Sequence, residues 1–426
     1  MSKVRLNLSE RDQKHIWHPL TQHRTASPPI GIVKASGALL WDEDGVAYID
    51  AIASWYTAMY GHCNEHIAAA VSEQLYELDQ VVFTGFTHKP AVRLSELLME
   101  ILPSDQQKIF FNDNGSTAVE AAIKMAIQYH FNKGEKRDTL LAFENGFHGD
   151  TFGAMSASGI SVYNGPFEEF FLKVKRIPTP QQGNTEEVLE QAQKLISEHS
   201  VAGFLYEPLV QGAAGMKFYE ADGLEAILTL CKENGILCIA DEVMTGFGKT
   251  GKNFASEYLN TQPDMMCLSK ALTAGMVAMS ITSSTQQVYD AFLSETVEKG
   301  FMHAHTYSAN PLGCAAAIAG IKLLTSEEIQ NDIRRITAAH SAFAKSIEGH
   351  ANVDAVRSMG VILAIDLNVE TDRYGALRNN WFQYFMDKGI FLRPLGNTIY
   401  VLPPYVITDK ELLQVYDAIS TLIDTV

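Results

Sequence analysis

The sequence contains little of what marks a secreted, membrane-spanning or metal-stapled protein. Its five cysteines are an odd number, are widely spaced and form no C-x-x-C pair, so a disulfide framework and a zinc site have little support and a reducing compartment fits best. No stretch approaches the ~20 apolar residues of a membrane span. The opening MSKVRLNLSERDQKH also lacks the apolar core of a signal peptide. We therefore expect a cytoplasmic protein that makes no membrane contact.

Basic side chains are scarce as well. A formal net charge of −17 results from 33 Lys and Arg against 50 Asp and Glu. Nucleic acids are bound through clustered Lys and Arg, so this sign argues against a nucleic-acid partner. At 426 residues the chain exceeds what one hydrophobic core usually holds, so we expect two linked domains.

Short apolar runs alternate with longer helical patterns through the middle of the chain. Continuous apolar strands between helices predict an α/β fold with a mostly parallel sheet that is covered on both faces. The expected strands are KIFFN (108–112), TLLAFE (139–144), AGFLYEP (202–208), ILCIADEV (236–243) and MMCLSK (265–270).

The pattern changes near residue 316. Two helical segments there lead to short alternating strands, and the last residues form an amphipathic helical pattern. This predicts a smaller α+β domain at 316–426, completed by the N-terminal segment 1–55. The large domain is then expected at 56–315.

Polar residues follow the expected strands, at the sheet edge where ligands of such folds gather. Ordinary turn chemistry explains the Asn, Gly, Ser and Thr among them well. Turn chemistry does not explain well why a lysine, Lys270, directly follows the apolar run MMCLS. The residues are Asn114 to Thr117, Phe147 to Asp150, Glu207, Asp241 and Lys270.

Three of these positions match the anchors of a pyridoxal phosphate. Apolar surroundings would favour the neutral, nucleophilic amine of Lys270 that Schiff-base chemistry needs, although a buried, paired lysine is at least as common. Asp241 would pair with a protonated pyridine nitrogen, or equally well with a structural cation. Gly115 and Ser116 open a helix, which is an anion site or an ordinary N-cap. The helix start, the aspartate and the lysine occur in chain order on one edge of the expected sheet. This combination favours a pyridoxal phosphate site over three unrelated structural roles.

Four long blocks resemble the class-III (omega-type) aminotransferases of fold type I. They are CIADEVMTGFGKTGKNFA, PDMMCLSKALTAG, NGFHGDTFGAMSASG and HTYSANPLGCAAAIA, and the similarity covers nearly the whole chain. The resemblance implies a seven-stranded-type, mostly parallel sheet and pyridoxal 5'-phosphate as cofactor. DQKHIWHPLTQH, SWYTAMYGH and LRPLGNTIYVLPPY further resemble the biotin-pathway members, which transfer an amino group to 8-amino-7-oxononanoate, generally from S-adenosylmethionine.

The resemblance also implies individual roles. Lys270 would hold the cofactor and move the proton, Asp241 would pair with the ring nitrogen, and the ring would lie between Val243 and Phe147. Further implied cofactor contacts are Gly115 and Ser116 at the phosphate, His148, Glu207 near the 3-hydroxyl, and His305 and Thr306 at the phosphate of the other subunit of a homodimer. Implied substrate contacts are Trp55, Tyr56, Phe147, Lys270, Ala304, Tyr400 and Arg393, which would grip the substrate carboxylate.

Four positions depart from the family pattern or narrow the choice of amino donor. Members that use glutamate carry an arginine where this chain has Tyr400, and a tyrosine cannot make that bidentate contact, so glutamate and 2-oxoglutarate are poor partners. Leu20 and Phe147 stand where the biotin enzymes often have tyrosine, which leaves the donor open between S-adenosylmethionine and lysine or another amine. Lys249 replaces the usual arginine, and we expect it to affect only a structural ion pair.

Other readings stay open at this point. The chain could be an omega-aminotransferase for a different amine, a glutamate-semialdehyde aminomutase, or a cofactor-binding regulatory protein without turnover. Testing a series of amino donors would identify an omega-aminotransferase for a different amine. A half-reaction with an amine would exclude a regulatory protein without turnover. No metal is expected, because His62 and His66 with Asn64-Glu65 between them give only a weak zinc-like spacing.

Overall fold

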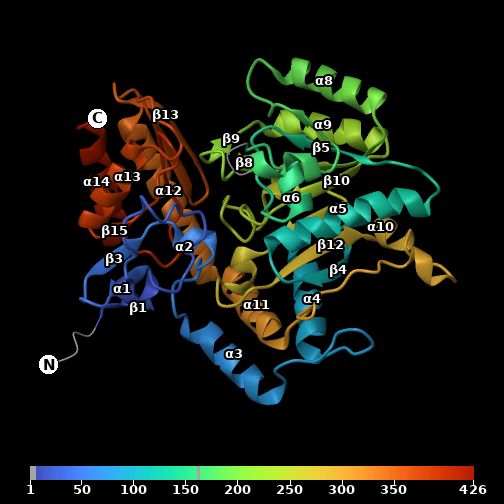
Figure 1. Ribbon diagram of the computed structural model, residues 1–426, viewed down its shortest axis with the longest axis horizontal. Coiled ribbons are helices and arrows are strands. Elements are labelled where there is room, and N and C mark those ends of the chain that lie inside the picture. The colour runs from blue at the N-terminus through green and yellow to red at the C-terminus, as the bar shows by residue number, and fades with distance from the viewer. Residues whose placement is uncertain (1–5, 161–163) are drawn as a thin grey trace.

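A computed structural model describes residues 6–160 and 164–426 of the chain (Figure 1). Its main feature is a seven-stranded sheet of order β4-β12-β11-β10-β7-β5-β6. The strands are β4 (Gln106–Asn112), β12 (Ser280–Thr285), β11 (Met265–Leu268), β10 (Leu237–Asp241), β7 (Val201–Tyr206), β5 (Thr139–Phe143) and β6 (Val174–Ile177).

The sheet is mostly parallel, as the sequence predicts. The pairs formed by β11, β10, β7, β5 and β6 are all parallel. β12 is antiparallel to both of its neighbours, β11 and β4. Because β4 is antiparallel to β12 and β12 is antiparallel to β11, β4 runs in the same direction as β11. The carboxyl end of β4 therefore lies at the same sheet edge as those of the parallel strands.

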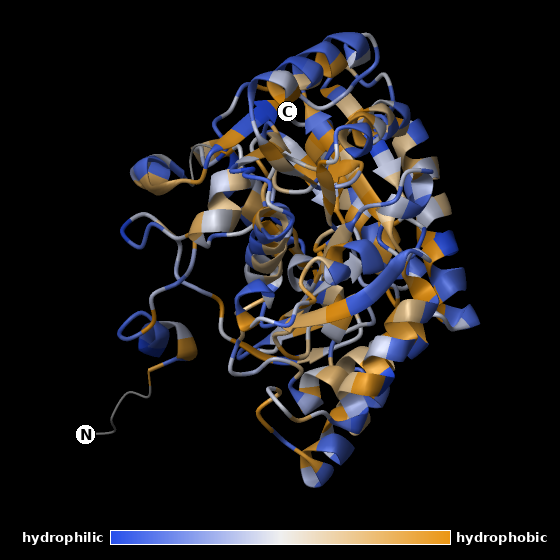
Figure 2. Ribbon diagram, turned by 90° about the vertical axis from the view of Figure 1, so that its right-hand side faces the viewer, coloured by the Kyte–Doolittle hydropathy of each residue, from blue (hydrophilic) through white to orange (hydrophobic). Residues whose placement is uncertain are grey.

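Helices cover both faces of this sheet, which is why its central strands are fully buried. Successive residues pack on opposite sides: Ile239 contributes to the core around α5 (Gly115–Asn132), and Ala240 to the core that includes α9 (Ala221–Glu233). In Figure 2 the interior strands are coloured as hydrophobic, and the helices around them show mixed colours. The other helices of this part are α6 (Phe152–Ala157), α8 (Thr185–Glu198) and α10 (Gln286–Asp290).

Two smaller sheets lie beside the main one, on the left in Figure 1. The first has the order β1-β2-β3-β15 and joins both ends of the chain, because β15 pairs in parallel with β3. The second has the order β13-β14-β16. The strands are β1 (Ile32–Ser36), β2 (Leu39–Asp42), β3 (Ala47–Asp50), β15 (Ile390–Phe391), β13 (Val353–Met359), β14 (Ile362–Leu367) and β16 (Thr398–Val401), with helices α12 (Glu327–Ile347), α13 (Ala376–Asp387) and α14 (Asp409–Ile423) beside them.

The remaining elements connect these parts. The domain boundaries after residues 55 and 315 stay a prediction, and residues 1–5 of the expected N-terminal segment lie outside the described residues. No helix of the described ranges has the length and apolar character that crossing a membrane requires. The elements are α1 (Leu8–Asp12), α2 (Ala53–Tyr56), α3 (Glu65–Glu77), α4 (Lys89–Ile101), α11 (Pro311–Leu324), the short pair β8 (Val210–Gln211) and β9 (Lys217–Phe218), and the 3₁₀ turns η1 (Gly165–Phe170), η2 (Ala255–Tyr258), η3 (Lys270–Thr273) and η4 (Val297–Lys299).

Candidate active site

The carboxyl ends of β4, β10 and β11 meet at one place. A Cβ on Gly115 would lie 2.9 Å from Cγ1 of Val243 and 3.7 Å from Cβ of Ser269. Val243 follows Asp241 by two residues and Ser269 directly precedes Lys270. The start of α5, the carboxylate and the amine are therefore within reach of one small molecule.

The first turn of α5 leaves backbone donors available. Asn114 caps the helix by accepting the N–H of Thr117 at 3.1 Å, and the Thr117 hydroxyl accepts the Asn114 N–H at 3.0 Å. The amides of Gly115 and Ser116 have no partner inside the helix, because the first N–H groups of a helix precede its hydrogen-bond ladder. Together with the helix dipole they favour an anion at this position.

Asp241 lies at the end of β10 and is held by two hydrogen bonds. Its Oδ1 accepts the N–H of Val243 at 3.1 Å, and its Oδ2 lies 2.8 Å from Nδ1 of His148. An ionised carboxylate can only accept, so Nδ1 of His148 carries the hydrogen. Both side chains are buried, and Nε2 of His148 has no partner among the described residues. His148 therefore orients Asp241, a relation that the sequence did not indicate.

Lys270 begins η3 directly after β11, with a left-handed φ of 51°. For a residue with a side chain such a conformation costs roughly 1–2 kcal/mol. Burial lowers the pKa of Lys270, while the charges of Asp241 and Glu207 act in the opposite direction. Its Nζ lies 5.0 Å from the centre of the Tyr56 ring. The lowered pKa increases the fraction of neutral amine, which is the nucleophilic form.

Glu207 follows β7 and fixes two loops at the site. Its Oε1 accepts the N–H of Phe147 at 3.0 Å and its Oε2 accepts the N–H of Gly212 at 2.9 Å. Burial raises the pKa of Glu207 to about 7, and the charge of Asp241 adds to this, whereas His148 and the two N–H groups lower it. The predicted contact of Glu207 with the 3-hydroxyl of a cofactor stays a prediction.

Four of the expected substrate contacts come together around Arg393, the residue expected to grip the substrate carboxylate. The guanidinium carbon of Arg393 lies 5.3 Å from the centre of the Trp55 ring, and the rings of Tyr56 and Tyr400 are 5.9 Å apart. Burial raises the pKa of Tyr400 to about 12, and that of Tyr56 also rises through burial, so both phenols are neutral at pH 7. Arg393 thus places a positive charge among the aromatic rings of Trp55, Tyr56 and Tyr400.

The loop with Ala304, His305 and Thr306 lies elsewhere in this single chain. Nδ1 of His305 is 3.6 Å from Oδ2 of Asp113, and the carbonyl of Thr306 accepts a hydrogen bond from Gln80 at 3.0 Å. No contact with Lys270 or Asp241 is present within the described parts of the chain. The predicted role of His305 and Thr306 at the phosphate of another subunit therefore depends on assembly, and the substrate contact of Ala304 stays a prediction.

Lys249 does not form the expected ion pair. Its side chain is fully buried and its Nζ donates to the carbonyl of Gly246 at 2.9 Å, without a carboxylate partner among the described residues. Nearby Glu242 instead accepts the Thr245 hydroxyl and two backbone N–H groups. Burial lowers the pKa of Lys249 well below its usual range, and Lys270 lowers it further. The lowered pKa favours the neutral amine at this buried position, and the charge of Glu242 acts in the opposite direction.

Comparison with known proteins decides the family. A sequence model described as aminotransferase class-III matches residues 21–423. The chain belongs to this family. Among the relatives of this class-III aminotransferase are the adenosylmethionine-8-amino-7-oxononanoate aminotransferases of Synechococcus elongatus, 41% identical over 97% of this chain and 99% of theirs, and of Geobacter sulfurreducens, 37% identical over 98% of each.

Solved structures agree with this placement. The adenosylmethionine-8-amino-7-oxononanoate aminotransferase of Methanocaldococcus jannaschii superposes with a TM-score of 0.92, at 32% identity and 98% coverage of both chains. An amine transaminase from an uncultivated Pseudomonas species, solved in its pyridoxal-phosphate-bound form, gives 0.90 at 29% identity over 96% of this chain and 98% of its own. The fold is therefore the predicted type I transaminase fold.

The site fits the pyridoxal phosphate on which class-III aminotransferases depend. A side chain on Gly115 would collide with Val243, so the glycine keeps the backbone donors of α5 open to a phosphate. Asp241 is a buried carboxylate on the same edge. Lys270 supplies an amine whose pKa is lowered by desolvation and which is close enough to Asp241 to feel its charge. An anion site, a partner for a ring nitrogen and a nucleophilic amine are the groups that this cofactor requires.

Proposed function

We propose that this aminotransferase transfers an amino group to 8-amino-7-oxononanoate, with S-adenosylmethionine as donor, and so forms 7,8-diaminononanoate in biotin synthesis. The observation that carries the proposal is the placement of Arg393 over Trp55, beside Tyr56 and Tyr400. A guanidinium in an aromatic pocket suits a long apolar substrate that ends in a carboxylate. The names of relatives that are 41% and 37% identical over the full length support the same acceptor.

The residues of the chain divide the work in the following way. Pyridoxal phosphate, when bound, supplies an aldehyde carbon for amino groups and a ring that accepts electrons. The amides of Gly115 and Ser116 would hold its phosphate, and Asp241, oriented by His148, would hold its ring nitrogen. Nζ of Lys270 takes the proton from the amine-bearing carbon of the donor and later returns a proton to the acceptor carbon.

Purified enzyme tests acceptor and donor separately. With 8-amino-7-oxononanoate present, S-adenosylmethionine, lysine, glutamate and simple amines are offered one at a time, and 7,8-diaminononanoate is measured by mass spectrometry. Product with S-adenosylmethionine supports the proposal, and product with lysine alone would correct the donor. Failure of every donor with this acceptor, together with transfer to another ketone, would assign the chain to the other omega-aminotransferases.

The exposed apolar residues support a homodimer. Trp17 is 89% exposed and Tyr76 90% exposed, and Met302 is largely exposed as well. Gln80 connects the segment after α3 to the loop with Met302 through its bond to Thr306, so these two stretches form one surface. Exposed patches of this kind mark protein interfaces. A partner that covers them would also lie against His305 and Thr306.

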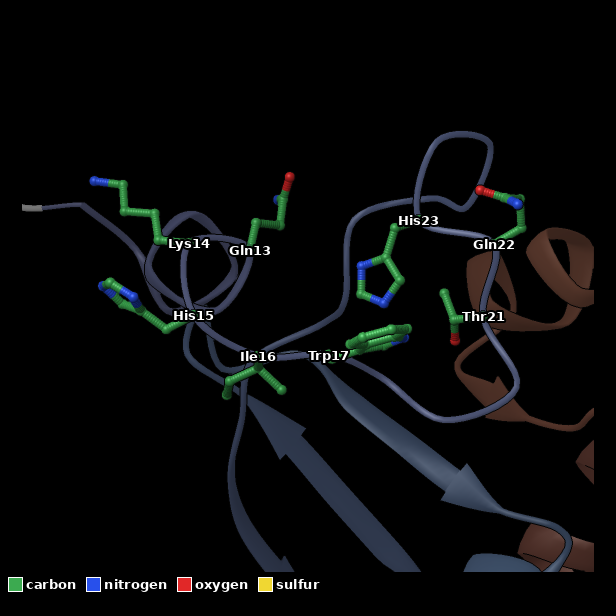
Figure 3. A pocket seen from close by; sticks show the side chains of 8 residues that line it. All are labelled: Gln13, Lys14, His15, Ile16, Trp17, Thr21, Gln22 and His23. Carbon is green, nitrogen blue, oxygen red and sulfur yellow. The ribbon is translucent and has the colours of Figure 1, made fainter. Parts of the chain in front are cut away.

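A second exposed stretch lies in the N-terminal segment, which carries Trp17. Figure 3 shows Trp17 and His23 side by side along an open hollow, which residues 13–17 and 21–23 line. Sedimentation of Tyr76→Asp and Met302→Asp variants tests the assembly, with Leu413→Asp on α14, where the side chain is 58% exposed, as the control. Monomers in the first two variants and a dimer in the control support the proposal, and an unchanged state in all three contradicts this interface. The cytoplasmic location stays a prediction.

A further inference from the structure

The segment that carries Trp55 and Tyr56 has an unusual backbone. Four successive residues, Ala53 to Tyr56, have positive φ values of 46°, 45°, 70° and 70°, and none of them is glycine. Residues with a side chain avoid this region because Cβ approaches the carbonyl oxygen. Such a left-handed turn persists only where its surroundings hold it.

Asp50 supplies the attachment at the start of this turn. Its side chain is completely buried at the end of β3 and accepts three hydrogen bonds. Oδ1 accepts the N–H of Ile52 at 3.2 Å, and Oδ2 accepts the hydroxyl of Ser54 at 2.8 Å and lies 2.8 Å from Nε2 of His62. Two of the three donors belong to the chain that enters and forms the turn, so the carboxylate fixes its path.

His62 connects the carboxylate to the neighbouring sheet. Its N–H and carbonyl pair with Gly37, at 2.8 and 3.2 Å, in an antiparallel bridge beside the turn between β1 and β2. The ring is largely buried, and because Asp50 accepts, Nε2 of His62 is the donor. The left-handed turn is thus tied through Asp50 and His62 to a part of the sheet that does not reach the substrate.

The turn ends at the candidate substrate pocket. Phe391 of β15 is the parallel partner of Asp50 in β3, so the chains that leave these two strands emerge at the same edge. Trp55 follows one strand and Arg393 follows the other, which brings the guanidinium over the indole at 5.3 Å. Tyr56, next in the turn, lies 5.0 Å from Nζ of Lys270.

We propose that Asp50 and His62 are positioning residues that hold the turn 53–56 in its left-handed form and thereby place Trp55 against Arg393 at the site of the substrate carboxylate. The inference rests on the proposed function for the identity of the carboxylated substrate. The geometry of the turn and its hydrogen bonds does not depend on that function. Neither residue contacts Lys270 in the described structure, so both act through the turn.

Variants of Ser54 separate the conformation of the turn from its hydrogen bond. Ser54→Ala removes the bond to Asp50 and leaves a residue that resists positive φ. Ser54→Gly removes the same bond, but glycine adopts positive φ without a steric penalty. If the bond serves to hold the turn, glycine at this position retains more substrate affinity than alanine.

Asp50→Asn and His62→Ala test the attachment directly, and His62→Gln restores an N–H donor. The KM for 8-amino-7-oxononanoate and the Kd for nonanoate, a nine-carbon carboxylate, are measured on the holoenzyme by assay and calorimetry. We expect both constants to rise about tenfold in Asp50→Asn and His62→Ala, the effect of losing one hydrogen bond to a charged group. His62→Gln should recover much of the loss, and the affinity for pyridoxal phosphate should stay unchanged.

Two control variants exclude a general loss of stability. Asp42→Asn removes a buried carboxylate from the same sheet at the other end of β3, where it accepts the Tyr48 hydroxyl and the Val46 N–H. His350→Gln changes an exposed His–Asp pair that involves Asp424. Both should leave the two constants unchanged, even where Asp42→Asn lowers the melting temperature.

Unchanged constants in folded Asp50→Asn and His62→Ala would overturn the inference, and so would an equal rise in Asp42→Asn. Equal losses in Ser54→Ala and Ser54→Gly would assign the Ser54 hydroxyl to the substrate instead of the turn. If the wild type binds nonanoate, the variants bind it weakly, and 8-amino-7-oxononanoate is not converted, the positioning role stands and the proposed acceptor falls. If 8-amino-7-oxononanoate is converted and the KM and Kd are unchanged in all variants, the proposed acceptor stands and the positioning role falls.

Discussion

His148 donates its Nδ1 hydrogen to Oδ2 of Asp241 over 2.8 Å, and neither side chain is accessible to solvent. The sequence places the two residues 93 positions apart, His148 in the loop after β5 and Asp241 at the end of β10. A fixed donor on one oxygen of a buried carboxylate and a backbone N–H on the other hold the group in one direction. Catalysis should therefore depend on His148 although it is not expected to touch the substrate.

Replacing His148 by leucine should lower kcat by about 10- to 100-fold, the usual cost of removing the partner that orients a functional group. His148→Asn keeps an N–H donor and should lose less. Stopped-flow measurement of the half-reaction with the amine donor gives the rate. A leucine variant as fast as the wild type would show that the backbone alone orients Asp241.

Lys270→Ala should abolish steady-state transamination and the visible absorbance of the holoenzyme at neutral pH. The buried amine has no replacement in this variant, because the other lysine nearby, Lys249, donates to Gly246. Absorbance spectra and product formation check the expectation. Full turnover in the variant would remove Lys270 from the mechanism.

Arg393→Ala should weaken the carboxylated acceptor far more than the cofactor. Loss of one partner of a desolvated charge pair costs roughly 2–5 kcal/mol, and Trp55 cannot supply a charge in its place. The KM for the acceptor and the Kd for pyridoxal phosphate are compared. Equal losses in both would contradict a specific role at the carboxylate.

Glu207 should make the cofactor-free protein less stable as the pH rises from about 4.5 to 7. Its pKa is raised to about 7, so between these values the folded state holds a proton that the unfolded state has released. The contribution is complete below pH 4.5 and is lost as the pH passes 7, with a total of about 3 kcal/mol at most. Urea unfolding of wild type and Glu207→Gln at several pH values measures it, and parallel curves for the two proteins would refute it.

Lys249→Met should stabilise the protein at pH 7. The pKa of Lys249 is lowered well below its usual range by burial, so the unfolded state binds a proton that the folded state lacks. The wild type therefore gains stability as the pH approaches 10.5, and the advantage of methionine shrinks there. A gain of about 1–3 kcal/mol at pH 7 is expected after loss of the bond to Gly246. A destabilised variant at pH 7 would indicate that Lys249 is charged in the folded state.

Five of the seven strands of the main sheet follow from local sequence patterns. The apolar runs at 108–112, 139–144, 202–208, 236–243 and 265–270 lie in β4, β5, β7, β10 and β11, because strands covered on both faces need unbroken apolar sequence. The chain order of Gly115, Asp241 and Lys270 then indicated a shared edge. Parallel strands end at one edge, so a motif at each strand end is enough to predict a common site.

Two features of the site had no signal in the sequence. His148 was expected only as a cofactor contact, because nothing local pairs it with a residue 93 positions away. Lys249 was expected in an ion pair, but its ammonium finds a carbonyl and no carboxylate. Both depend on which side chains the packed strands bring together, and pattern and propensity do not contain that information.

The sequence by itself determined the family, five strands of the main sheet and the chain order of the residues around the cofactor, because periodicity and strand-end motifs act over a few residues. Only the tertiary structure decided that Ala53 to Tyr56 turn left-handed, since local preference opposes that conformation and buried Asp50 and His62 hold it. It also decided the pKa shifts of Glu207 and Lys270, because these depend on removal from water by residues far away in the chain.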